Sequence, residues 1–106
     1  MSKITLTHDN QEYILEYSRQ SVKTMESQGF NIDQVGEKPA TMIPLLYEGA
    51  FIKNCRGIKR KVMDEIYDGI KEKAPFIQAL AELYAETLST LMEDNPEGNV
   101  TWAMTR

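Results

Sequence analysis

Two side chains, His8 and Cys55, are the first candidates for metal or nucleophilic chemistry, because the chain holds one residue of each type. A zinc site needs three or four His, Cys or carboxylate ligands, and a catalytic cysteine needs a base beside it. His8 falls in a polar stretch typical of a turn. Cys55 has Lys53, Arg56 and Lys59 nearby, which could lower the pKa of its thiol. We interpret Cys55 as a half-buried residue at a helix end, and we predict no enzyme, no metal site and no cofactor.

Carboxylates recur at spacings that could serve acid–base chemistry, in Asp64, Glu65 and Asp68 and again in Glu82 and Glu86. All of them fall on the polar faces of amphipathic helices, where contact with solvent explains them. The six glycines are isolated from one another, so no glycine-rich phosphate loop is expected.

A basic cluster is the most distinctive charge feature, and it contains Lys53, Arg56, Lys59, Arg60 and Lys61 with no acid among them. Such a cluster could bind nucleic acid or an acidic protein segment. Residues 74–105 hold no basic residue and five acids, so the two regions could also attract each other, within one molecule or between copies. The net charge is -4 and the cluster lacks interleaved aromatic residues, which makes nucleic acid the weaker interpretation.

The length of 106 residues predicts one domain, which we place at residues 1–94 with a tail over 95–106. Hydrophobic residues make up 42% of the chain, which allows a modest core whose stability is marginal unless a partner covers part of it. One cysteine excludes an internal disulfide and is typical of a reducing compartment. No apolar run approaches the ~20 residues of a membrane span, and no signal peptide is recognised. We therefore expect a cytoplasmic protein.

The elements that position these residues begin with a β-hairpin. Residues 3–7 alternate polar and apolar, residues 12–17 are rich in β-formers, and the polar stretch 8–11 lies between them. One face of the hairpin would carry Ile4, Leu6, Tyr13, Leu15 and Tyr17. A lone hairpin is only marginally stable in water, so we expect it to pack against helices.

Four helices are expected, over about residues 19–28, from 39 or 41 to 54, over 58–72 and over 75–92. Ser18 is a suitable N-cap for the first helix, and Gly29 is well placed to end it. Gly49 and Ala50 in the second helix are small enough to let a neighbouring element approach closely. The predicted fold is α+β, mostly α, with an N-terminal β-hairpin packed on about four helices and a flexible C-terminal tail.

The tail contains Trp102, the only tryptophan, between Val100 and Met104. An exposed tryptophan is common where proteins bind one another. Alternatively, Trp102 folds back to cap the domain, and the sequence leaves both interpretations open.

The chain resembles a family of small phage and prophage proteins, the tail assembly chaperones of long-tailed bacteriophages. The resemblance rests on residues 3–7 (KITLT), 12–19 (EYILEYSR), 21–30 (SVKTMESQGF), 38–51 (KPATMIPLLYEGAF), 64–67 (DEIY) and 98–102 (GNVTW). It covers nearly the whole chain, and it is a match of overall pattern rather than of a catalytic signature.

The resemblance implies a protein that binds the long, hydrophobic, helical tape measure protein in the host bacterial cytoplasm. Such a chaperone keeps the tape measure protein soluble until tail tube subunits polymerise around it, and it is absent from the mature virion. The resemblance leaves open contact with the tail tube protein, self-association, and a longer product made by ribosomal frameshifting. No membrane partner is implied.

A tape measure helix could be covered by helix-in-groove packing. We predict a groove whose floor is formed by Met42, Leu46, Gly49 and Ala50, with Tyr47, Phe51 and Trp102 as anchors. The basic cluster is the predicted contact for an acidic partner segment. Two alternatives remain: a nucleic-acid-binding phage regulator that uses residues 53–61, and a minor structural tail protein.

Overall fold

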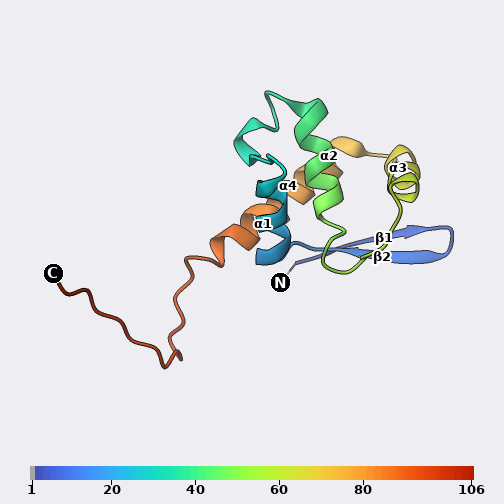
Figure 1. The fold of residues 1–106 in the computed structure, drawn as a ribbon. Helices are drawn as coiled ribbons and strands as arrows, with labels where there is room; N and C mark the ends of the chain where they lie inside the picture. The colour runs from blue at the N-terminus through green and yellow to red at the C-terminus, as the bar shows by residue number, and fades with distance from the viewer. Residues whose placement is uncertain (1) are drawn as a thin grey trace.

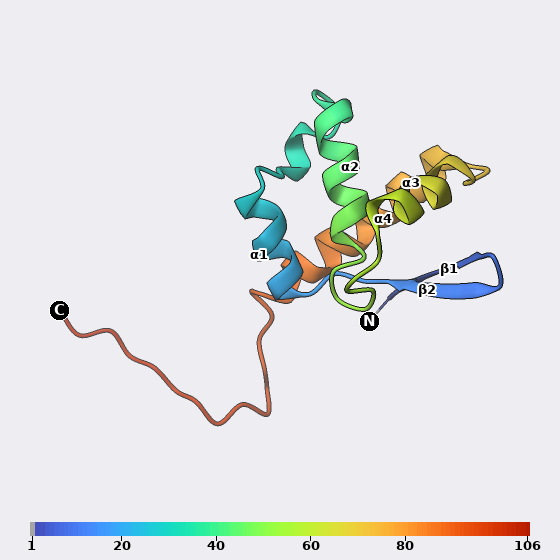
Figure 2. The same ribbon diagram turned by 45° about the vertical axis from the view of Figure 1, so that its right-hand side comes forward.

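The computed structural model describes residues 2–106. Its elements follow the order β1 (Ile4–His8), β2 (Gln11–Leu15), α1 (Arg19–Ser27), the single 3-10 turn η1 (Ile32–Gln34), α2 (Pro39–Gly49), α3 (Arg60–Asp68) and α4 (Lys73–Ser89). Helices α1, α2 and α4 gather into one body, and the hairpin extends from it beneath α3 (Figures 1 and 2). The predicted fold, a hairpin with four helices, is confirmed.

The hairpin closes through a two-residue turn at Asp9 and Asn10, which have φ values of 50° and 63°. Positive φ at both central residues is what a tight hairpin turn requires, and Asp and Asn tolerate it better than most residues. The register pairs Ile4 with Leu15, and it pairs Leu6 with Tyr13. The predicted apolar face is therefore correct. At the end of the hairpin opposite the turn, Leu15 on this face is 0% exposed.

Helix α1 begins and ends close to where the sequence predicts. The Ser18 hydroxyl accepts a hydrogen bond from the Ser21 N–H at 3.1 Å, and the Ser21 hydroxyl accepts one from the Ser18 N–H at 2.8 Å. This reciprocal pair satisfies donors that a helix start leaves free. Gly29 follows the helix with φ of 95°, a conformation that glycine adopts without strain.

The remaining helices are shorter than predicted or shifted. Helix α2 ends at Gly49 instead of near residue 54, and the Ala50 carbonyl accepts a hydrogen bond from the Glu16 N–H at 3.2 Å. Helix α3 starts two residues later and ends four residues earlier than the predicted 58–72. Helix α4 begins at Lys73, so that Pro75 lies within its first turn, where proline is tolerated.

The core lies where α2 crosses α1 and α4. Its buried residues form one cluster: Leu15, Tyr17, Val22, Met25, Phe30, Met42, Leu46, Tyr47, Ala50, Phe51, Leu80, Leu83 and Tyr84. A Cβ placed on Gly49 would lie 2.6 Å from Cγ of Met25, so the two helices approach closely here and a larger residue would require the Met25 side chain to shift. This contact confirms the prediction that a small residue lets a neighbouring element approach closely.

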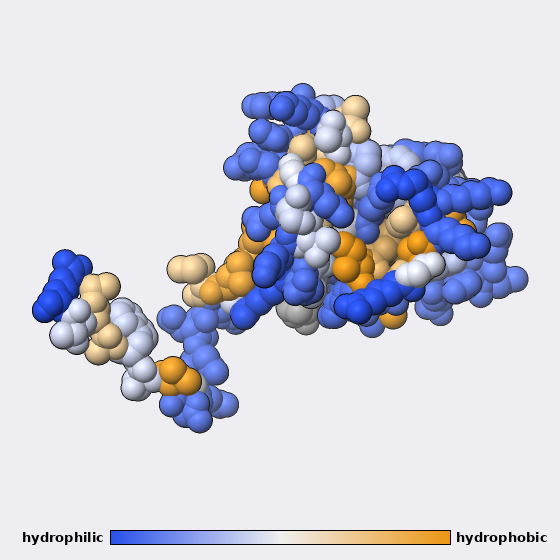
Figure 3. Space-filling model, in the orientation of Figure 1, coloured by the Kyte–Doolittle hydropathy of each residue, from blue (hydrophilic) through white to orange (hydrophobic). Residues whose placement is uncertain are grey.

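Beyond Ser89 the chain has no helix or strand, and its last residues stand away from the body (Figures 1 and 3). The radius of gyration is 16.2 Å, whereas a compact domain of this length has about 13 Å. Figure 3 shows apolar side chains spaced among polar ones along this segment. Within the described part of the chain, no helix is both long and apolar enough to cross a membrane.

Candidate functional site: a groove between α2 and α3

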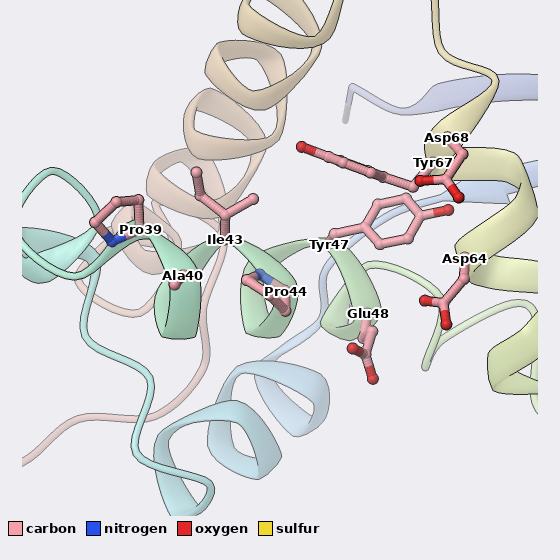
Figure 4. A pocket seen from close by; sticks show the side chains of 9 residues that line it. All are labelled: Pro39, Ala40, Ile43, Pro44, Tyr47, Glu48, Asp64, Tyr67 and Asp68. Carbon is pink, nitrogen blue, oxygen red and sulfur yellow. The ribbon is translucent and has the colours of Figure 1, made fainter.

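The candidate site is a groove of about 520 Å³ between α2 and α3, called the α2–α3 groove below. Helix α2 contributes Pro39, Ala40, Ile43, Pro44, Tyr47 and Glu48, and helix α3 contributes Asp64, Tyr67 and Asp68. The α2 residues recur in pairs every four positions, so they share one face of the helix. Figure 4 shows the rings of Tyr47 and Tyr67 near each other, with three carboxylates toward α3 and the prolines with Ile43 toward the other end.

Tyr47 forms the floor of the groove and joins its two walls. Its side chain is 3% exposed, and its hydroxyl donates a hydrogen bond of 2.6 Å to the Met63 carbonyl. Its ring meets the ring of Tyr67 edge-on, with centroids 5.1 Å apart. Burial raises the pKa of Tyr47, and the negative charges of Asp64 and Glu48 raise it further. The hydroxyl therefore stays protonated and holds α3 against α2.

The rim of the groove is acidic. Glu48 forms an ion pair of 3.1 Å with Arg60, which bridges the two helices at one end. Asp64 and Asp68 are exposed, and their carboxylates form no ion pair with any residue in the range 2–106. Lys73 lies 5.5 Å from the centre of the Tyr67 ring and donates to the Asp68 and Ile70 carbonyls instead. Two carboxylates are thus available to a basic partner group.

A helical carbonyl in the wall of the groove lacks its usual partner. Pro44 lies inside α2 and has no N–H, so it cannot donate to the carbonyl of Ala40, four residues earlier. Both residues line the groove. The wall of the groove therefore includes a point where the regular hydrogen bonding of α2 is interrupted.

Residues 1–105 match the family model described as "Domain of unknown function (DUF5055)". The chain belongs to this family. No curated protein and no solved structure matches the chain. The DUF5055 description names no activity, so the groove is the feature from which a function must be inferred.

The groove of this DUF5055 chain lies on a different face of α2 from the predicted one. Met42, Leu46 and Ala50 pack in the core and none of them lines this groove, so the prediction that they form its floor is wrong. Tyr47 does line the groove. Gly49 and Phe51 are also buried, and they border a separate recess near Cys55.

Sequence reasoning missed the open wall of the groove, which consists of Pro39, Ala40, Ile43, Pro44 and Tyr67. The signal that could have found it is the pair of prolines in α2. A proline inside an apolar helix leaves a carbonyl free, and such a helix face is less suited to close packing in a core.

Trp102 does not cap the domain. Its side chain is 85% exposed, with Val100 at 86% and Met104 at 68%. The alternative in which the tail folds back over the body therefore does not describe this structure. As a partner anchor, Trp102 stays a prediction, and it lies outside the residues that line the groove.

The basic cluster is divided by the fold. Lys53 pairs with Glu16 at 3.1 Å and Arg60 pairs with Glu48, so these two cations already have acidic partners. The other three members, Arg56, Lys59 and Lys61, are exposed. The hydrogen bond from the Asn54 amide, followed by the contact with Lys53, lowers the pKa of Glu16.

Cys55 and His8 are not brought together. Cys55 is half-buried in the loop after α2, as interpreted from the sequence. Burial raises the pKa of its thiol, so the pKa is not lowered as its basic neighbours would have allowed. Nε2 of His8 lies 3.4 Å from the carboxylate of Asp9. Across residues 2–106, no group of three or more His, Cys, Asp or Glu side chains could hold a metal ion.

Proposed function

We propose that this protein is a chaperone whose α2–α3 groove binds an amphipathic helix of another protein. The observation that carries the proposal is an apolar groove, floored by Tyr47, whose rim holds the unpaired carboxylates of Asp64 and Asp68. Exposed apolar surface rimmed by polar groups is typical of protein-binding sites. The partner is the tape measure protein of a long-tailed phage, an identity that rests on the resemblance to tail assembly chaperones.

The groove favours a helix with apolar side chains on one face and lysine or arginine beside them. Apolar residues at spacings of three and four would cover Ile43, Pro44 and Tyr67. A flanking cation would pair with Asp64 or Asp68, and such rim charges raise association rates more than they raise affinity. Covering the apolar face of a tape measure helix would prevent it from aggregating until tail tube subunits enclose it.

The test is co-expression with the long helical protein encoded by the neighbouring gene, with the soluble fraction of that protein measured. Wild type should keep it soluble, and Ile43→Asp should fail, because it places a carboxylate on the apolar wall. Met92→Asp is the matched control, since Met92 is 86% exposed and lies outside the groove. The proposal is contradicted if the protein encoded by the neighbouring gene stays equally soluble without this chain. It is also contradicted if that protein stays equally soluble with a folded Ile43→Asp variant.

Location separates a chaperone from a minor structural tail protein. We propose that the protein acts in the host bacterial cytoplasm and is left out of finished particles. Quantitative mass spectrometry of purified virions should find it only at trace level relative to the tail tube protein. A fixed stoichiometry in the particle would favour the structural role.

A further inference from the structure

The hairpin has one covered edge and one open edge. On β2, the Ile14 carbonyl accepts a hydrogen bond from the Asn54 amide at 3.3 Å, and the Glu16 N–H donates to Ala50. The loop after α2 therefore covers that edge. On β1, the two-residue turn makes every second residue face β2, so Thr5 and Thr7 direct their N–H and C=O groups outward. Within residues 2–106, no backbone group of either threonine is bonded to another segment.

The tail has the residue pattern of a strand that could fill this edge. Val100, Trp102 and Met104 lie at every second position, and each is more than two-thirds exposed. In extended backbone these three side chains share one face. On β1, Ile4 and Leu6 have the same spacing and are only half-buried. A third strand beside β1 would continue the apolar face of the hairpin with the tail side chains.

We propose that residues 100–104 of one copy pair with the open edge of β1 in a second copy, so that two copies exchange their tails. The tail stands away from its own body, which leaves it available to another molecule (Figures 1 and 3). Exchange of the same element in both directions gives a two-fold symmetric dimer. Backbone hydrogen bonds to Thr5 and Thr7 supply the pairing, and the alternate apolar side chains supply the burial.

Charges at the two ends favour a parallel alignment. Lys3 precedes β1 and Asp9 follows it, and both are exposed. Glu97 precedes the tail strand and Arg106 follows it. A parallel strand brings Glu97 toward Lys3 and Arg106 toward Asp9, whereas an antiparallel strand brings Arg106 toward Lys3. None of the residues in this exchange lines the α2–α3 groove, so the dimer does not depend on the proposed chaperone function.

Sedimentation of the full chain and the fluorescence of its single tryptophan test the exchange together. Wild type should dimerise as concentration rises, and the Trp102 emission should shift to shorter wavelength in parallel. Trp102→Ser should weaken the dimer about 30-fold, as loss of an aromatic anchor does. Thr101→Ser is the matched control on the opposite face and should dimerise as wild type does.

A mixing experiment assigns the acceptor. Thr5→Pro removes an outward N–H from β1, which edge strands tolerate, and it keeps Trp102. The double variant Val100→Ser with Trp102→Ser keeps the edge and has no tryptophan. Each variant alone should be monomeric. Adding the double variant to Thr5→Pro should shift the Trp102 emission to shorter wavelength, because the tail of Thr5→Pro can then pair with the intact β1 edge of the double variant. If Thr5→Pro does not fold, the comparison of Trp102→Ser with Thr101→Ser decides by itself.

Three results would overturn the exchange. One is a wild-type chain that stays monomeric, with solvent-exposed Trp102 fluorescence, at every concentration. Another is a short-wavelength emission that is present in the monomer, because the tail would then lie on its own body. The last is a Trp102→Ser dimer as strong as that of wild type.

Discussion

Helix α2 has two apolar faces, and the chain uses them differently. Met42, Leu46 and Gly49 face α1 and α4 and are buried by the chain itself. Ile43 and Pro44 line the α2–α3 groove and remain partly or fully exposed. The difference teaches that apolar spacing identifies the residues whose burial is favourable. Whether the chain itself buries them depends on how the other elements pack. We interpret the uncovered face as the one reserved for a partner.

The two faces should differ most in how much the free energy of unfolding falls when one side chain on each face is shortened. Leu46 is 0% exposed, so Leu46→Ala should lower the free energy of unfolding by about 3 kcal/mol, as large cavities do. Ile43→Ala should cost about 1 kcal/mol or less, because its surroundings are already open to water. Urea denaturation of both variants measures the contrast. Equal losses would mean that the two faces are not distinct.

The contact between Gly49 and Met25 tests how tightly the core face is filled. Gly49→Ala should destabilise the fold by about 1–3 kcal/mol, because its new methyl group collides with the Met25 side chain. In the Gly49→Ala background, Met25→Ala should cost less than it does in wild type. A double-mutant cycle by thermal unfolding measures this coupling, and strictly additive losses would rule out the collision.

Tyr47 joins the two faces, and its hydroxyl can be removed without removing its ring. Tyr47→Phe should cost about 1 kcal/mol, since the Met63 carbonyl loses its donor. It should also loosen α3, which hydrogen exchange of the α3 amides would detect. Tyr17→Phe, which removes a donor to Leu46 on the core side, is the control that should leave α3 exchange unchanged.

Alkaline pH acts on the same tyrosine. Burial raises the pKa of Tyr47 above its ordinary value of 10.0, so folding favours the protonated form. The resulting stability is fully present below pH 10 and is lost as pH rises beyond it. Denaturation midpoints measured from pH 8 to about 11 should fall less steeply in Tyr47→Phe than in wild type. Tyr17, Tyr84 and Cys55, whose pKa values burial also raises, contribute to the loss that remains.

The smallest effect is expected at the rim. Arg60 is 72% exposed in its ion pair with Glu48, so Arg60→Gln should change stability by less than about 1 kcal/mol. The variant frees a third rim carboxylate, so association with a basic helix should become faster, with a steeper dependence on salt. Stopped-flow association at two salt concentrations measures this. Slower association would contradict the role assigned to the rim.

The hairpin and α1 follow from local sequence, because their turn, alternation and caps involve residues within a few positions of one another. The end of α2 does not, since it depends on a bond between the Ala50 carbonyl and Glu16, which come from distant segments. Cys55 shows the same limit. Lys53 and Arg56 lie close to it in sequence, but burial raises the pKa of the thiol, and this outweighs the lowering by the Ile14 carbonyl.

The groove was only partly predictable for the same physical reason. The sequence marks α2 as apolar on several sides, and it places Tyr47 among the binding residues. Which side stays open depends on where α3 is held. The Tyr47–Met63 hydrogen bond, the Tyr47–Tyr67 ring contact and the Glu48–Arg60 ion pair all join α3 to α2. Periodicity within one helix carries no information about these distant contacts.

The central claim, that the α2–α3 groove holds a partner helix, can be tested by NMR of isoleucine methyl groups. The chain would be titrated with soluble helical fragments of its proposed partner, the long helical protein encoded by the neighbouring gene. We predict that the Ile43 signal shifts with bound fraction while buried Ile66 stays nearly unchanged, and that added salt slows association. Binding that shifts signals near residues 53–61 and leaves Ile43 unmoved would contradict the claim.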